Sequence, residues 1–344
     1  MRIFSYRNKR TLQRIALIAL LAAVLIGLLI LARISYLGRY AVYSPDGVYF
    51  DKTQKLQRTP QTPADTSDAE EYPFETILSA AAEESDVDPN AVQLHGFYIS
   101  TTMLANSVDE VRQALADADG YNAVLIDVKS PLGNFYYSTD IADTQTADAD
   151  IAACDALIRE LTETPDLIVI ARVPTFSDPN FVAKHYSSAL TTKSGDLWMD
   201  ERRCYWLRPD SLDARSYLAA IALELDARGF DEVLFDNFTV PDDASIAWDT
   251  EAITQIAALE DCAETLGANL TGSSIRLALG TSVPSVAQYA SRVYITTEKA
   301  NDVMTVTESM AEVLPDPSTQ LVFVTTSHDT RFDASGVIRP LMGE

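Results

Sequence analysis

Residues 122–130 read NAVLIDVKS, and this stretch decides how the chain folds. It is a short apolar run rich in β-branched residues, which is typical of a strand buried on both faces of a parallel sheet. Because side chains alternate along a strand, Leu125, Asp127 and Lys129 share one face, and the valine and isoleucine residues share the other. The stretch therefore predicts a buried strand that carries charged groups at its carboxyl end.

Further runs of this kind occur along the chain. They are LHGFYIS (94–100), DLIVIARVPTF (166–176), DEVLFDNFTV (231–240), IRLALGTS (275–282), RVYITTE (292–298), LVFVTTS (321–327) and, as the only candidate for an eighth, GVIRPLM (336–342). Several stretches between them have helical periodicity and are long enough to connect parallel strands: 108–118, 149–161, 211–228 and 250–266. The alternation predicts repeated βα units.

Repeated βα units with doubly buried strands allow two architectures. About 250 residues of such repeats fit an α/β fold of the (β/α)8 barrel (TIM barrel) type, whose last strands we expect to be less regular here. A doubly wound open sheet is the alternative, but no glycine-rich phosphate loop follows the first strand to favour it. We predict the barrel.

The amino-terminal segment predicts a membrane anchor. Residues 15–32, IALIALLAAVLIGLLILA, contain no charge and approach the ~20 residues that span a hydrocarbon core. Five basic residues and no acid precede this transmembrane helix, so the positive-inside rule places residues 1–14 in the cytoplasm. A cleaved signal peptide is the alternative, but its apolar region is shorter, and ARISY (32–36) is a poor cleavage site. We predict a single-pass cell-membrane protein whose carboxyl-terminal domain is extracytoplasmic.

Two regions follow the predicted helix. Residues 33–73 are expected to form a linker, and the part from 52 to 73 has too few large apolar residues to offset the entropy of ordering. We therefore predict that 52–73 is disordered. Residues 74–344 are expected to form the barrel domain, with a short helix at 74–92.

Charge and cysteine content exclude several classes of function. Residues 41–344 carry 19 basic and 50 acidic side chains, so nucleic acid and anionic lipid are not expected partners. The cysteines Cys154, Cys204 and Cys262 form no C-x-x-C spacing, and the sequence contains no zinc signature, P-loop or catalytic-triad motif. We expect no metal and no cofactor.

Three charged residues are expected to meet at the mouth of the barrel. The carboxyl ends of the strands form the active-site face of such barrels. Asp127 and Asp236 lie at two of these ends in the inward phase, and Arg172 has the same phase in the strand between them. Two carboxylates bridged by an arginine are suited to catalysis. A buried ion-pair network that only completes the barrel is the alternative.

Further candidates lie on the loop side of the barrel. In the long connection 177–210, Trp198 and Trp206 can stack on sugar rings or, alternatively, pack the loop onto the barrel. Glu298 and the Ser-His-Asp corner at 327–329 follow other strands, where a solvated loop group is the alternative in each case.

Several strings of this sequence together resemble a bacterial family of predicted glycoside hydrolases, which are TIM-barrel domains found on cell-surface proteins. The similar strings are HGFYIS, YNAVLIDVKSPLGNFYY, IVIARVPTFSDP, SGDLW, CYWLRPDS and GFDEVLFDNFTVP, which run in order from about 95 to 241. The family's motifs are matched by Asp127 with Lys129, by Arg172 after an alanine, and by Asp236 with Pro241. The resemblance implies a barrel that hydrolyses glycosidic bonds.

The chain departs from the family's pattern within these motifs. Asn237 replaces the expected Tyr, Thr239 replaces the Arg, and Arg208 stands where an Asp or Asn is usual. The fifth strand, in LALGTSVPS, lacks the family's acid, and the resemblance fades after about residue 245. These departures indicate either an altered substrate or a barrel that binds without cleaving.

The sequence as a whole predicts a membrane-anchored glycoside hydrolase of the cell envelope, acting on a poly- or oligosaccharide through Asp127 and Asp236. Such carboxyl pairs lie ~5 Å apart in retaining and ~6.5–9.5 Å apart in inverting enzymes. The alternative is a non-catalytic glycan-binding or scaffold barrel. The predicted substrate-binding residues are Lys129, Arg172, Trp198, Trp206, Asn237 and Glu298.

Overall fold

The computed structural model describes residues 41–44, 47–50 and 92–342. The predicted basic tail, transmembrane helix and disordered segment lie outside these residues, as does the predicted helix at 74–92 except for its last residue. Within the described part of the chain, no helix is long and apolar enough to cross a membrane.

Two short strands pair within the segment predicted as a linker. Strand β1 (Ala41–Ser44) runs antiparallel to strand β2 (Gly47–Phe50), and Ser44 lies opposite Gly47. The linker prediction did not include this small sheet.

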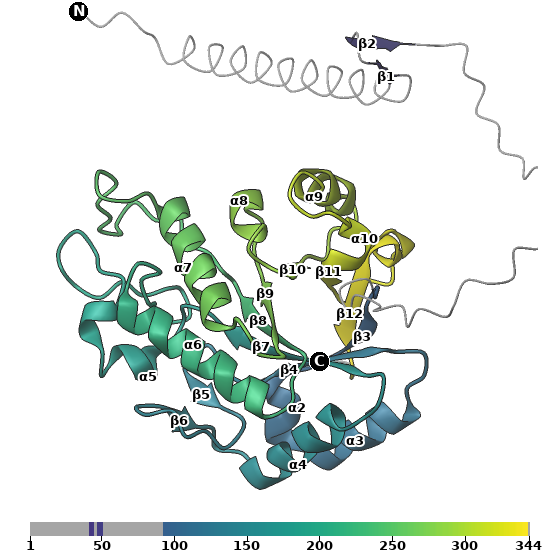
Figure 1. The fold of residues 1–344 in the computed structure, drawn as a ribbon, viewed down its shortest axis with the longest axis horizontal. Coiled ribbons are helices and arrows are strands. Elements are labelled where there is room, and N and C mark those ends of the chain that lie inside the picture. Colours follow the sequence, from purple (N-terminus) through teal and green to yellow (C-terminus); the bar gives the residue numbers. More distant parts are fainter. Residues whose placement is uncertain (1–40, 45–46, 51–91, 343–344) are drawn as a thin grey trace, which may run out of the picture. The chain divides into compact units, whose positions relative to one another are not determined.

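Eight parallel strands close a barrel, and their order around it is their order along the chain (Figure 1). The strands are β3 (His95–Ile99), β4 (Ala123–Asp127), β7 (Ile168–Pro174), β8 (Glu232–Asp236), β9 (Arg276–Leu279), β10 (Arg292–Thr296), β11 (Leu321–Val324) and β12 (Gly336–Pro340). Each apolar run identified in the sequence forms one strand. Because β12 pairs with β3, the (β/α)8 barrel is confirmed and the open sheet is wrong.

The connections between the strands differ in regularity. The first half of the barrel has α2 (Thr101–Asn106), α3 (Val108–Asp117), α4 (Ile151–Thr162), α5 (Pro179–Val182), η2 (Tyr186–Ser188), α6 (Leu212–Ala227) and α7 (Gln255–Asn269), with a small sheet of β5 (Asn134–Phe135) and β6 (Gln145–Thr146). The second half has α8 (Pro284–Ala287), α9 (Asp302–Met310), α10 (Pro317–Gln320) and η3 (Thr330–Ala334). Short helices occur in both halves, and the last strands, which were expected to be less regular, each pair in parallel with both neighbours.

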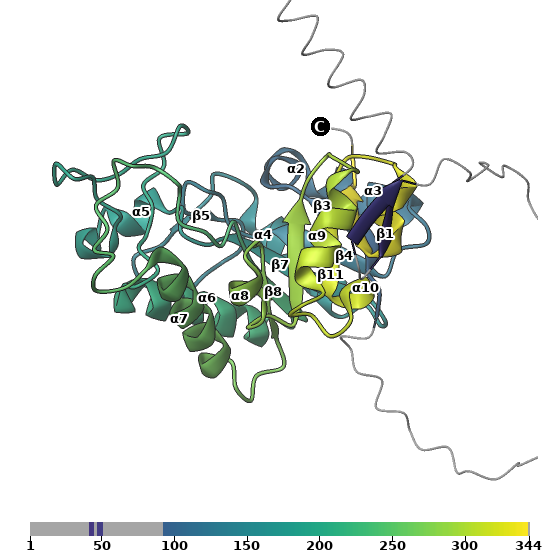
Figure 2. The ribbon, with the colours of Figure 1, turned by 90° about the horizontal axis from the view of Figure 1, so that it is seen from above.

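Capping residues set where the long helices begin. The Ser211 hydroxyl accepts a hydrogen bond from the backbone N–H of Ala214 and starts α6 at the predicted position. The Thr254 hydroxyl does the same with Ala257, so α7 begins after Thr254 rather than at the predicted residue 250. Helices α6 and α7 lie side by side on the outside of β8 (Figure 2).

Alternation along the strands produces two apolar layers. The inward side chains fill the barrel: Leu94, Tyr98, Ala123, Leu125, Ile170, Leu234, Ala278, Tyr294, Val322, Val324 and Ile338. The outward ones pack against the helices and include Val124, Ile126, Val169, Ala171, Val233 and Phe235. The predicted alternation of inward and outward side chains is confirmed. Leu125, Ile170 and Leu234 point into the barrel, so the side chains two residues later, Asp127, Arg172 and Asp236, point toward its mouth.

The amino-terminal end of the barrel is closed by a buried ion-pair cluster. Glu232 at the start of β8 accepts hydrogen bonds from Arg276 and Arg292 on one oxygen and from the Tyr294 hydroxyl, at 2.9 Å, on the other. The side chains of Glu232 and Arg292 have no exposed surface. Burial, reinforced by Glu232, raises the pKa of Tyr294 well above its usual value. The cluster fixes the beginnings of β8, β9 and β10 to one another.

Candidate active site

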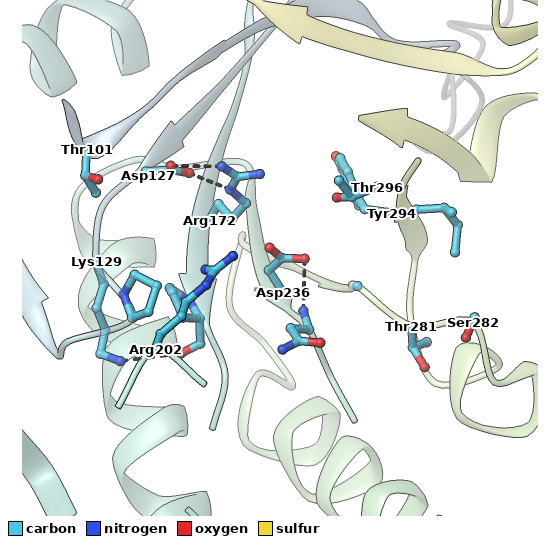
Figure 3. Close-up of a pocket in the computed structure, with 15 residues that line it drawn as sticks. Thr101, Asp127, Lys129, Arg172, Arg202, Asp236, Thr281, Ser282, Tyr294 and Thr296 are labelled. Atoms are coloured by element: carbon cyan, nitrogen blue, oxygen red, sulfur yellow. Dashed lines mark hydrogen bonds and ion pairs between the residues drawn. The ribbon is translucent and has the colours of Figure 1, made fainter. Parts of the chain in front are cut away.

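The residues predicted to meet at the barrel mouth do lie together there. Asp127 ends β4 and is the register partner of Arg172 on β7, while Asp236 ends β8 opposite Pro174. All three side chains line one pocket of about 530 Å³ (Figure 3). The site is therefore built by three consecutive strands of the barrel.

Asp127 and Arg172 form a two-pronged ion pair. The Arg172 Nε and Nη2 atoms donate to the two carboxylate oxygens of Asp127 at 2.5 and 2.8 Å. Burial acts to lower the pKa of Arg172, but the charge and hydrogen bonds of Asp127 outweigh it, so this pKa is raised. The guanidinium also lies over the ring of Tyr98, 5.5 Å from its centroid. Both oxygens of Asp127 are thus engaged.

Asp236 is held differently. Its Oδ1 atom accepts one hydrogen bond, from the backbone N–H of Asn237 at 2.9 Å, and its Oδ2 atom has no partner within residues 92–342. Burial raises the pKa of Asp236, the charge of Asp127 adds to this, and Arg172 and the Asn237 N–H act against it. The ion-pair network expected as the alternative therefore joins Asp127 to Arg172 but leaves Asp236 without a direct bond to Arg172.

The backbone around Asp236 is shaped to orient its carboxyl group. Asn237 has a φ of 53°, in the left-handed region, and this turns its N–H back toward Asp236. Gly280, after β9, lies against the same group: a Cβ atom there would come within 2.6 Å of Asp236 Oδ1 and 3.0 Å of the Asn237 nitrogen. The glycine leaves the space that the carboxyl group fills.

A second hollow adjoins the first and extends under the long loop 177–210. It measures about 470 Å³ and shares five residues with the first pocket: Pro131, Pro174, Arg202, Asp236 and Asn237. Asp236 thus lies where the two hollows meet. Together they form a cleft that extends on both sides of Asp236.

The predicted substrate-binding aromatics line the second hollow. Trp198 and Trp206 are only 7% and 6% exposed and pack edge to face, with ring centroids 5.9 Å apart. The indole N–H of Trp198 donates to Asp243, and that of Trp206 donates to Asp200, each at 3.0 Å. Both rings pack the loop onto the barrel, and both contribute to the wall of the cleft.

Lys129 lines the pocket, but its ammonium group faces the protein. It pairs with Asp178 at 3.0 Å, and both side chains are almost fully buried. Asp178 also accepts from the Tyr217 hydroxyl at 2.7 Å and from the backbone N–H of Phe181, where it caps α5. The lysine joins β4 to the start of the long loop.

The remaining predicted residues differ in position. Asn237 is exposed in the cleft. Glu298 lies outside both hollows, where its carboxylate accepts bonds from Thr325 and Thr326 that lower its pKa. Asp329 caps η3, and hydrogen bonds from Arg331 lower its pKa to about 2. Glu298 and Asp329 thus brace loops after β10 and β11.

Several residues of the cleft were missed by sequence reasoning. They are Thr101, Arg202, Thr281, Ser282, Tyr294 and Thr296. Thr101, Thr281, Ser282 and Thr296 end a barrel strand or closely follow one, so the rule that assigns strand ends to the mouth would have included them. Tyr294 lies in the middle of β10, and that rule does not point to it. Arg202 belongs to the long loop, whose path the sequence does not reveal.

The described residues hold no group of three or more His, Cys, Asp or Glu side chains that could bind a metal ion. The polar groups that line the cleft are carboxyl, ammonium, guanidinium, hydroxyl and amide groups. A protonatable carboxyl group beside an ionised one is the arrangement used for glycoside hydrolysis.

Comparison with known families agrees with this geometry. A family described as "Putative glycosyl hydrolase domain" matches residues 96–307, which run from β3 into α9 and make up more than half of the chain. The chain belongs to this family. The family resemblance seen in the motifs is confirmed, and the glycosyl hydrolase match continues well past residue 245, where the recognisable motifs end. No curated protein matches the chain.

Solved structures of similar fold include proteins from bacteria and a fungus. An α-galactosidase from Thermus thermophilus has 13% identity and a TM-score of 0.50, with 72% of this chain and 57% of that chain covered. A hypothetical protein from Ruminiclostridium thermocellum has 23% identity and a TM-score of 0.46, over 53% and 96%. Ega3 from Aspergillus fumigatus, in complex with galactosamine, has 13% identity and a TM-score of 0.46, over 73% and 92%. The first of these likenesses supports the barrel fold.

Proposed function

We propose that the barrel hydrolyses glycosidic bonds in a poly- or oligosaccharide, with Asp236 as the general acid. The observation that carries the proposal is the state of the Asp236 carboxyl group, which has a raised pKa and one oxygen open to the cleft. A group that protonates a glycosidic oxygen near neutral pH needs both properties. Its place where the two hollows meet would put the bond to be cleaved between two bound sugars.

Asp127 is the second carboxyl group of the proposed pair. Its charge, balanced by Arg172, would stabilise the positive charge that develops on the sugar ring in the transition state. Each Asp127 oxygen accepts one hydrogen bond from Arg172 and keeps a second lone pair, which is what a base or nucleophile would use. The alternative of a glycan-binding barrel predicts a single acid in the mouth or a blocked mouth; here two acids line an open pocket.

The proposal includes a location at the cell envelope, supported by the uncharged run at 15–32 and the basic residues before it. Protease added to intact cells should then degrade the domain and leave a small membrane-bound fragment.

The hydrolase proposal is tested by screening the full-length chain for release of reducing ends from cell-wall and capsular polysaccharides. We expect Asp236→Asn to lower the rate about 10²–10⁴-fold, because the amide cannot donate a proton as an acid does. Glycan binding should persist. A wild-type chain that binds glycans and cleaves none of them would favour the binding barrel.

A further inference from the structure

The first pocket has a charge balance opposite to that of the chain. The protein has 50 acidic and 26 basic side chains. The pocket is lined by two acids, Asp127 and Asp236, and by three basic residues, Lys129, Arg172 and Arg202. A pocket lined by more basic than acidic residues, in an acidic protein, points to the chemistry of its ligand.

Two of the three basic side chains, Lys129 and Arg172, already form ion pairs within the protein. Arg172 uses only part of its guanidinium group to do so. Lys129 pairs with Asp178. Arg172 uses Nε and Nη2 to bind Asp127, and its Nη1 atom has no hydrogen-bond acceptor among residues 92–342. One N–H-bearing edge of the Arg172 guanidinium is therefore left for a ligand.

Arg202 is the cation without a partner. Most arginine and lysine side chains in residues 92–342 form ion pairs, as Arg112, Arg208 and Arg228 do. The Arg202 side chain makes no ion pair or hydrogen bond with the described residues, although it extends into the pocket and lines both hollows (Figure 3). A free guanidinium presents five donors in a planar fork that matches an oxyanion.

We infer that the first pocket binds an anionic group of the glycan, held by Arg202 and by the free edge of Arg172. The inference rests on the proposed function and adds the substrate class: a sugar bearing a carboxylate, sulfate or phosphate group. Thr101, Thr281 and Ser282 supply hydroxyl donors around the same space. An anionic sugar binds in this pocket rather than in the second hollow, because that hollow is lined by Asp200 and Glu201.

The acidic character of the whole domain limits the form of the ligand. Long-range repulsion slows the approach of a polyanion, whereas a contact with guanidinium at hydrogen-bond distance acts over a few ångströms. The preferred ligand is therefore a glycan with isolated anionic groups rather than a densely charged polymer.

The test measures binding and hydrolysis of matched oligosaccharides by the full-length chain purified in detergent. Each set shares one sugar skeleton and contains a neutral member, a carboxylate, sulfate or phosphate derivative, and a cationic amino-sugar derivative. We expect one anionic derivative to bind at least about tenfold more tightly than its neutral counterpart, as charge-assisted hydrogen bonds imply. Which derivative shows this preference identifies the anion.

Arg202→Gln should abolish most of that preference. Arg203→Gln is the matched control, because it removes the same charge one residue further along the loop and Arg203 lines neither hollow. Equal effects of the two variants would overturn the inference, since only long-range charge would then be involved.

The remaining outcomes separate the inference from the hydrolase proposal. Cleavage of neutral or cationic members, with no preference for an anionic one, would overturn the inference and leave the hydrolase standing. Binding of these members without cleavage or anionic preference would overturn both. Failure to bind or cleave any member would overturn both.

Discussion

One strand carries an acid at each of its ends, and the two acids have opposite surroundings. Glu232 begins β8 and Asp236 ends it, and both point into the barrel, in phase with Leu234. Glu232 is fully buried, and both of its oxygens accept hydrogen bonds from basic or hydroxyl side chains. Asp236 accepts a single bond from its neighbour's backbone and keeps one oxygen open.

The difference separates a structural charge from one available for chemistry. A buried charge is tolerated only where it is paired and hydrogen-bonded, as Glu232 is. Asp236 lacks such compensation, and its pKa is raised instead. What distinguishes the proposed catalytic acid from the structural one is its incomplete set of hydrogen bonds, since both acids point into the barrel.

The largest effect on stability is expected at the amino-terminal end. Glu232→Gln would leave Arg276 and Arg292 without their shared carboxylate, and breaking a buried pair costs about 3–5 kcal/mol. Chemical denaturation followed by circular dichroism would measure the loss. A change below about 1 kcal/mol would mean that the cluster is not what holds this end together.

Asp236→Asn should have a small effect on the same measurement. The carboxyl group pairs with no cation directly, so its removal leaves no buried charge stranded, and we expect the free energy of unfolding to stay within about 1 kcal/mol of wild type. A loss as large as that of Glu232→Gln would erase the contrast between the two ends and show a structural role for Asp236.

Gly280→Ala should move the Asp236 carboxyl group. The added Cβ would lie 2.6 Å from Asp236 Oδ1, so the side chain or the backbone at Asn237 must shift. We expect about 1–3 kcal/mol of destabilisation from overpacking and at least a tenfold loss of hydrolysis, because the acid is displaced. Gly267→Ala is the control: its nearest contact would be Leu277 at 3.9 Å, and activity should be unchanged.

The smallest effect is a pH dependence of stability with opposite signs at two aspartates. Because the folded pKa of Asp236 is raised above 3.8, the stability it contributes is present below that pH and is lost as pH rises through the folded pKa. Asp329, whose pKa is lowered to about 2, contributes stability above 3.8 that is lost as pH falls toward 2.

Thermal melts of wild type, Asp236→Asn and Asp329→Asn across pH 2–7 would show these signs. Compared with Asp236→Asn, wild type should lose stability as pH rises through the folded pKa of Asp236. Compared with Asp329→Asn, wild type should lose stability as pH falls toward 2. The same sign for both would contradict the assigned surroundings.

The barrel and the inward phase of its strands could be predicted because both follow from local periodicity. The alternation in residues 122–130 and 231–240 placed Asp127 and Asp236 at the mouth, and parallel pairing of β4 with β7 brought Arg172 to Asp127. The start of α7 was misplaced, because Thr254 competes with earlier residues as a cap.

The finer features of the site depend on contacts between segments far apart in the sequence. The sequence around Lys129 does not indicate that this residue would form an ion pair with Asp178. The sequence around Arg202 does not indicate that its side chain would lack an acidic partner among the described residues. The approach of Gly280 to Asp236 likewise arises only when β8 and β9 pair. Sequence patterns give the positions of such side chains, whereas tertiary packing determines whether they find hydrogen-bond or ion-pair partners.

The pairing of β12 with β3 has a consequence for the order in which the chain folds. Val337 lies opposite His95, so the contact that closes the barrel joins residues more than two hundred positions apart. Contacts of such long sequence separation form late, because the entropy of closing the intervening loop has to be overcome first. Until then, β3 and β12 each present an unpaired edge, and at that stage the chain is most exposed to pairing with another copy of itself.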